Sequence, residues 1–149
     1  MLMTGSGPLD AERAFTRARR SRRLAGIARR LRREAPGGAE LPVYDERALV
    51  RAPARPGVGI REIPLAAIGG TLEPSRATLF DGCFRPAARA RRRWQRLWLA
   101  EHRGEVLPPI SVVPVGDAYA IRDGHHRVSV AAARGALTID ATIEVPAVS

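Results

Sequence analysis

The last third of the chain has the clearest pattern of apolar and polar positions. Apolar residues dominate "PPISVVPV" (residues 108–115) and return in "AYAIR" (residues 118–122), with Gly116 and Asp117 between the two runs. This spacing predicts a β-hairpin with a two-residue turn. Residues 138–145, "TIDATIEV", alternate strictly between polar and apolar, which predicts a strand with one buried face.

Two helices are predicted on either side of the hairpin. Residues 128–134 are a short run of small and apolar residues closed by Gly135, and residues 86–103 are a longer helical pattern that ends before Gly104. The apolar positions of the longer helix share one face, and we expect its two tryptophans to pack on a sheet. These positions are Ala90, Trp94, Leu97 and Trp98.

The preceding region is less regular. Residues 60–70, "IREIPLAAIGG", predict a short strand and one turn before two glycines, and residues 71–84 predict a loop. Residues 36–59 are rich in Pro, Gly and Ala, which predicts a linker or a wrapped connection, with one short helical pattern at residues 45–50. The order of strand, hairpin, helix and strand predicts a small α+β domain with a mixed sheet.

The N-terminal region predicts a separate helix. Residues 9–34 contain many arginines, begin with acidic residues and stop before "PGG" at residues 36–38. Their apolar stripe is too narrow for a core helix, so we expect this helix to dock lightly, meet a partner or lie along a polyanion. The stripe consists of Leu24, Ile27, Ala28 and Leu31.

Charge divides the chain in the same way. The net charge is +10 in 149 residues, and every basic residue is Arg, a bias that a GC-rich genome also explains. Residues 1–36 carry 10 Arg and 3 acidic residues (+7), residues 37–103 carry 12 and 7 (+5), and residues 104–149 carry 3 and 5 (−2). The predicted units are therefore an Arg-rich helix at 1–38, a linker at 39–59 and an α+β domain at 60–149.

Several classes of protein are disfavoured. Cys83 is the only cysteine, which excludes an intramolecular disulfide and a thiolate metal cage. No apolar run approaches the ~20 residues needed to span a bilayer, and the first residues lack the apolar region of a signal peptide. We expect a cytoplasmic protein without a membrane partner, and the sequence assigns no role to Cys83.

The candidate chemistry lies in "DGHHR", where the hairpin meets the next helix. A helix start has unpaired N–H groups and partial positive charge, and Gly124 allows a ligand to approach the backbone. Arg127 is a cationic fork suited to phosphate oxygens, and His125 and His126 can donate hydrogen bonds. Asp123 is the tentative catalytic residue, because it is the one acid that the sequence places beside this phosphate site.

A structural role for the same residues is the alternative. The histidines can cap the helix, and Arg127 can pair with Asp123. A metal site is the weaker interpretation, because adjacent histidines in a helix diverge by about 100° and few carboxylates are nearby. We therefore expect no resident metal.

Residues from about 60 to 145 resemble the ParB/sulfiredoxin superfamily in its ParB-like nuclease-domain form. The resemblance rests on "REIPLAAI", "LPPISVVPVGDAYAIRDGHHRVSVAAARG" and "IDATIEV". It implies that the segment from Gly124 to Arg127 binds nucleotide phosphates. Sulfiredoxins carry their reactive cysteine where this chain has His125, so we do not expect sulfinic-acid reductase activity. The second nucleotide motif and the helix-turn-helix of partitioning ParB proteins are not found.

The leading hypothesis is a regulatory, nucleotide-binding ParB-like module that takes ATP, ADP or CTP, with Mg²⁺ as an accompanying ion. Its N-terminal helix would contact DNA or RNA, or an acidic protein partner, because neutralising phosphates favours binding. A nucleotide hydrolase or small-molecule kinase that uses the same box is the first alternative, and a protein-interaction module with a structural box is the second. The expected nucleic-acid contacts are Arg17, Arg20, Arg23 and Arg30.

Overall fold

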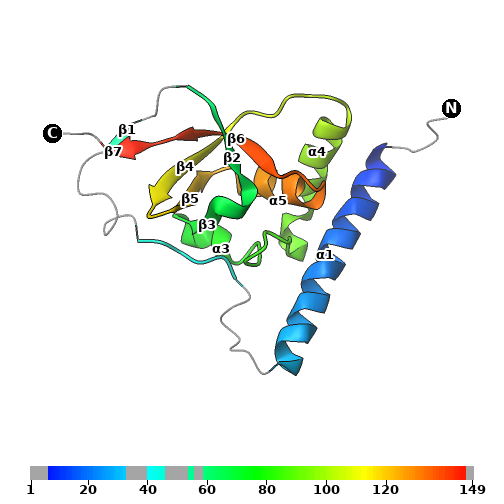
Figure 1. Ribbon diagram of the computed structural model, residues 1–149. Helices are drawn as coiled ribbons and strands as arrows, with labels where there is room; N and C mark the ends of the chain where they lie inside the picture. The colour runs from blue at the N-terminus through cyan, green and yellow to red at the C-terminus, as the bar shows by residue number, and fades with distance from the viewer. Residues whose placement is uncertain (1–6, 33–39, 46–53, 56–58, 147–149) are drawn as a thin grey trace.

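A computed structural model describes residues 7–32, 40–45, 54–55 and 59–146, and it shows the expected α+β architecture (Figure 1). Helix α5 lies against a mixed five-stranded sheet, α4 packs on α5, and α1 packs on α4. The helices are α1 (Gly7–Leu31), η2 (Leu65–Ala67), α3 (Pro74–Ala77), η3 (Ala88–Ala90), α4 (Arg91–His102) and α5 (His125–Ala133). The strands are β1 (Ala54–Arg55), β2 (Arg61–Pro64), β3 (Ile68–Thr71), β4 (Ile110–Val115), β5 (Ala118–Asp123), β6 (Thr138–Ile143) and β7 (Val145–Pro146).

The sheet has the strand order β2-β6-β4-β5-β3. The predicted hairpin is confirmed, because β4 and β5 pair antiparallel with Val115 opposite Ala118. The alternating strand β6 is also confirmed; it pairs parallel with β4, and Ala141 is buried opposite Ile110. The sequence did not predict β3, which pairs parallel with β5 at the sheet edge. The residues after β3, expected to be a loop, contain the one-turn helix α3.

Helix α1 is confirmed, and it docks through residues other than its predicted apolar stripe, whose contact with a partner or a polyanion stays a prediction. Leu24 is 56% exposed and Leu31 is 80% exposed, whereas Ala11 and Phe15 are buried. The Phe15 ring meets Trp94 edge-on with 5.4 Å between centroids. The first half of the helix therefore docks on the domain, because small residues one turn apart let Phe15 approach α4 closely.

Helix α4 is confirmed, but it begins at Arg91 rather than at residue 86, after the 3-10 turn η3. Gly104 follows it with a left-handed φ of +85°. The expectation that the tryptophans pack on the sheet is wrong, because α5 lies between α4 and the sheet. Trp94 is fully buried and its Nε1 donates a hydrogen bond to Ser129 Oγ of α5 at 2.9 Å. Trp98 is only partly buried and stacks on His102.

Part of the predicted linker packs on the domain. Leu41 is buried, and the backbone of Pro42 and Tyr44 exchanges hydrogen bonds with Thr71 of β3. The residues of β1 pair with β7. The helical pattern at 45–50 lies outside the described residues except for Asp45, and the division of the chain at residues 38 and 59 stays a prediction.

The hydrophobic clusters on the two faces of the sheet differ in size. Val112, Ile121 and Val128 belong to the large cluster beneath the helices, whereas Val113 and Ala120 form a small cluster on the opposite face. Within the described part of the chain, no helix combines the length and the apolar character that crossing a membrane requires.

Candidate phosphate-binding site

The turn between β5 and α5 is a single glycine. Gly124 has φ +113° and ψ +22°, a left-handed conformation that side chains disfavour. A Cβ at this position would lie 2.4 Å from Ile110 Cγ2, so the neighbouring strand also requires glycine. Helix α5 begins at His125, three residues earlier than the predicted start at residue 128. The Val128 N–H is the first in α5 to bond to a carbonyl four residues back, at Gly124, and the N–H groups before it face the start of the helix.

His125 lies inside the domain, with 4% of its surface exposed. Its Nε2 is 2.6 Å from Thr71 Oγ1, which also accepts a hydrogen bond from the Glu73 N–H at 2.8 Å. The imidazole is nearly parallel to the Phe80 ring, with 6.5 Å between centroids. These contacts hold one edge of His125 against β3.

His126 is also buried, at 7% exposure, but its contacts are different. Phe80 meets its ring edge-on at 5.1 Å, and no hydrogen-bond partner of the imidazole is found in the described part of the chain. Among the described residues, neither ring nitrogen of His126 has an assigned partner, whereas His125 has one at Nε2.

Burial and nearby arginines keep both histidines neutral. Desolvation is the main cause that lowers the pKa of His125 and of His126 from 6.5 to about 4. The positive charges of Arg76 and Arg93 lower both values further, whereas Asp123 opposes this effect on His125. At neutral pH the site therefore contains two neutral imidazoles beside two guanidinium groups.

Arg76 and Arg93 could not be singled out from the sequence. Arg76 lies on α3, within residues expected to be a loop, and Arg93 lies in a run of arginines that reads as a solvated helix face. Neither guanidinium has an ion pair or a hydrogen bond among the described residues. Only the folding of α3 and α4 around α5 brings their charges to the histidines.

Arg127 has acceptors within the protein. Its Nη1 donates to the carbonyls of Pro108 and Pro109 at 2.6 and 2.7 Å, and its Nη2 donates to Asp123 Oδ2 at 3.1 Å. The guanidinium thus ties the start of α5 to the segment before β4. A direct phosphate contact by Arg127 stays a prediction, and the geometry favours a positioning role.

Asp123, the tentative catalytic residue, is at the rim of the site. Its side chain is 71% exposed and pairs with Arg127. Among the described residues, no group of three or more His, Cys, Asp or Glu side chains is arranged to hold a metal ion. The arrangement can hold an anion, and any Mg²⁺ would depend on the oxygens of a bound phosphate.

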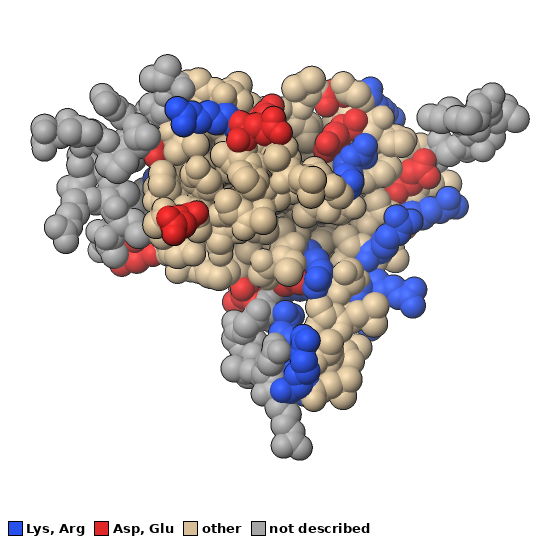
Figure 2. All heavy atoms as spheres, in the orientation of Figure 1, with Lys and Arg blue, Asp and Glu red and all other residues tan. Residues whose placement is uncertain are grey.

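The arginines expected to contact nucleic acid do not form one surface. Basic side chains follow α1 along its length in Figure 2. Arg20 and Arg23 line one shallow hollow of α1, and Arg23 and Arg30 line the next. Arg17 lies apart from these hollows and lines a pocket shared with α5.

Comparisons with known proteins find similarity among solved structures. No protein-family model matches the chain, and no curated protein matches it. Among solved structures, sulfiredoxin from Arabidopsis thaliana is matched at 25% sequence identity with a TM-score of 0.42. The match covers 57% of this chain and 83% of the sulfiredoxin chain.

Proposed function

We propose that this chain is a regulatory, nucleotide-binding ParB-like module whose phosphate site is the start of α5. The observation that carries the proposal is the burial of His125 and His126 at the start of α5, where the positive charges of Arg76 and Arg93 act on both imidazoles. Unpaired guanidinium groups beside helical N–H groups favour an anion over any neutral ligand.

Each group has a distinct role in this site. The N–H groups at the start of α5 donate to phosphate oxygens, while Arg76 and Arg93 supply permanent charge. His126 offers the imidazole that has no assigned partner, and His125 is oriented by Thr71. Arg127 and Gly124 maintain the turn that aims these donors. The resemblance in sequence to ParB-like proteins identifies a nucleotide, among the possible anions, as the expected ligand.

The histidines make the proposal testable by pH. A phosphate stabilises the protonated imidazole, so binding raises the pKa of a histidine from about 4 and takes up protons. Affinity should therefore increase as the pH falls from 7.5 to 6. A ligand that contacts only the arginines would show no such dependence.

The decisive experiment is calorimetric titration with ATP, ADP, CTP and GTP, with and without magnesium. Replacing both Arg76 and Arg93 with Gln should weaken binding at least tenfold, since each removes a charge-assisted contact. The matched control replaces Arg89 and Arg92, exposed residues of the same helical region that do not act on the histidines. Absence of binding by all four nucleotides at millimolar concentration contradicts the proposal.

A second function is favoured by the charge of α1. This helix carries eight arginines and two acidic residues, and its second half exposes Leu24 and Ile27. We infer that it contacts the phosphates of DNA or RNA without sequence preference. Binding that falls steeply with added salt, and that is lost when Arg20, Arg23 and Arg30 become Gln, supports it. Binding to an acidic protein, with no affinity for DNA or RNA at low salt, would replace it.

A further inference from the structure

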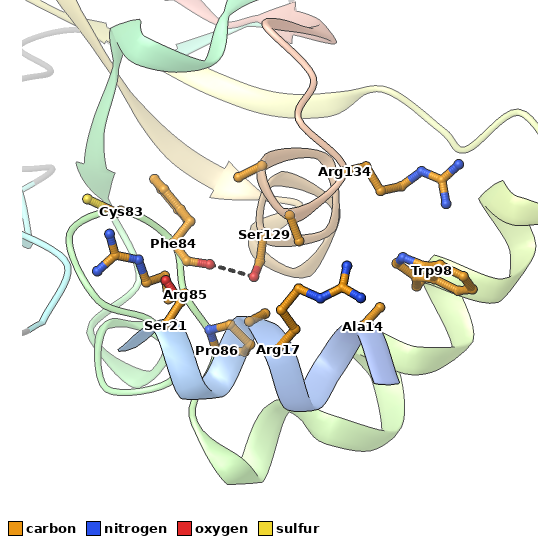
Figure 3. A pocket seen from close by; sticks show the side chains of 13 residues that line it. Ala14, Arg17, Ser21, Cys83, Phe84, Arg85, Pro86, Trp98, Ser129 and Arg134 are labelled. Carbon is orange, nitrogen blue, oxygen red and sulfur yellow. Dashed lines mark hydrogen bonds between the residues drawn. The ribbon is translucent and has the colours of Figure 1, made fainter. Parts of the chain in front are cut away.

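A separate pocket lies between α1, the loop before η3, α4 and the end of α5 (Figure 3). Its volume is about 640 Å³, which is within the range of roughly 300–1,000 Å³ typical of small-molecule sites. It lies toward the carboxyl end of α5, whereas the candidate phosphate site is at the amino end. Small and apolar side chains form much of its lining: Ala14, Ala18, Pro86, Trp98, Ala132 and Ala133.

Three arginines from different parts of the chain also line this pocket. Arg17 comes from α1, Arg85 from the loop before η3 and Arg134 from the end of α5, and none of the described residues that line the pocket is acidic. Figure 3 shows Arg85 and Cys83 at one end and Arg134 and Trp98 at the other, with Arg17 between them. The charge therefore extends along the pocket.

The positive charge of these arginines is only partly neutralised by nearby carboxylates. Arg17 has no ion pair or hydrogen bond among the described residues. Arg85 Nη1 is 3.5 Å from Asp81 Oδ2, and Arg134 Nε is 3.8 Å from Glu101 Oε1. Both distances are long for an ion pair, so these guanidinium groups retain N–H donors for a ligand.

The wall of the pocket is held in place by hydrogen bonds. Asp81 is buried, and its Oδ1 accepts hydrogen bonds from the backbone of Cys83 and Arg85 at 3.0 and 2.8 Å. Ser129 of α5 donates to the Phe84 carbonyl. The loop is thereby tied to α5, and the pocket exists before any ligand enters.

We propose that this pocket binds a small organic anion with an apolar body and a phosphate or carboxylate group. The alanines, Pro86 and Trp98 contact the body, and Arg17 and Arg134 contact the charged group. The ligand joins α1 to α5, because each of these helices supplies one of the two arginines. The proposal is independent of the nucleotide site and concerns a different ligand.

Cys83 provides a direct reporter of occupancy. It is exposed, lines the pocket and is the only cysteine of the chain, so its alkylation reports on this place alone. With 1-naphthyl phosphate as the probe, iodoacetamide should alkylate Cys83 at least threefold more slowly at saturation. Calorimetry on the intact chain should give a dissociation constant that increases at least tenfold when Arg17 and Arg134 are both replaced with Gln.

Two controls make the result specific. Replacing Arg13 and Arg92 with Gln removes the same charge from exposed positions outside the pocket and should leave binding unchanged. Inorganic phosphate should protect Cys83 at least tenfold less well than the naphthyl ester. The proposal is overturned by equal weakening in both double variants, by equal protection from inorganic phosphate, or by unchanged alkylation at millimolar probe.

Discussion

The start of α5 and the helix α1 both looked functional in the sequence, but they use their residues differently. The histidines of the "DGHHR" box are buried and Arg127 bonds to neighbouring backbone, whereas most arginines of α1 are exposed. The side chains of a specific motif can therefore serve to build a turn, while the positive charges that act on its histidines come from elsewhere, here from Arg76 and Arg93. The arginine-rich helix α1 instead keeps most of its charged side chains accessible, and it also contributes Phe15 to the core.

The largest expected effect tests the docked half of α1. Phe15→Ala should lower the free energy of unfolding by about 3–5 kcal/mol, because it removes a fully buried ring from its contact with Trp94. Leu24→Ala, on the exposed half of the same helix, should cost less than about 0.5 kcal/mol. Urea denaturation measures both. If the two variants are equally stable, α1 is the separable unit that the boundary at residue 38 predicts.

The next effect tests the buried histidines through pH. Their folded pKa of about 4 is below the unfolded value of 6.5, so the unfolded state binds more protons between these values. The stability that the neutral histidines contribute is fully present above pH 6.5 and is lost as the pH falls from 6.5 toward 4. Stability should decrease by about 2 kcal/mol per histidine between pH 7 and pH 5.

Single variants separate this contribution from other titrating groups. His126→Gln should reduce the pH dependence of urea denaturation by about half, because one of the two buried imidazoles is gone. His102→Gln, at an exposed position on α4, should leave it unchanged. A pH profile identical in all three proteins would show that the histidines are not desolvated.

A smaller effect tests the glycine of the motif. Gly124→Ala should cost about 3 kcal/mol, since it combines a left-handed φ with a clash against Ile110. Gly82→Ala is the control, because a Cβ there meets nothing within 4 Å. Thermal and urea unfolding should both rank Gly124→Ala far below Gly82→Ala, and equal stabilities would contradict the observed turn.

The smallest effect decides the role of Arg127. Arg127→Ala should lower the stability of the ligand-free protein by about 2 kcal/mol, because it removes charge-assisted hydrogen bonds to Pro108, Pro109 and Asp123. Arg127→Lys should recover part of this loss. An unchanged ligand-free protein that no longer binds nucleotide would instead establish a direct phosphate contact.

Local rules predicted much of the fold and part of the candidate site. The turns at Gly116-Asp117 and at Gly124 could be predicted, because they need backbone conformations that glycine allows and that depend only on neighbouring residues. The strand β3 could not be predicted, because "IGGT" lacks alternation and its pairing with β5 depends on distant residues. Phe15 was overlooked because the alanines beside it give a weak apolar stripe.

The sequence by itself determined the order of α1, α4, the hairpin of β4 and β5, α5 and β6, and it showed that β5 is followed by a helix beside a pair of histidines. The tertiary structure alone decided that the Arg127 fork faces Pro108 and Pro109, and that Arg76 and Arg93 act on the histidines. The physical reason is the distance along the sequence over which each kind of interaction acts. Turns, caps and amphipathic periods arise from residues a few positions apart, whereas burial, desolvation and charge convergence arise only when distant segments pack together.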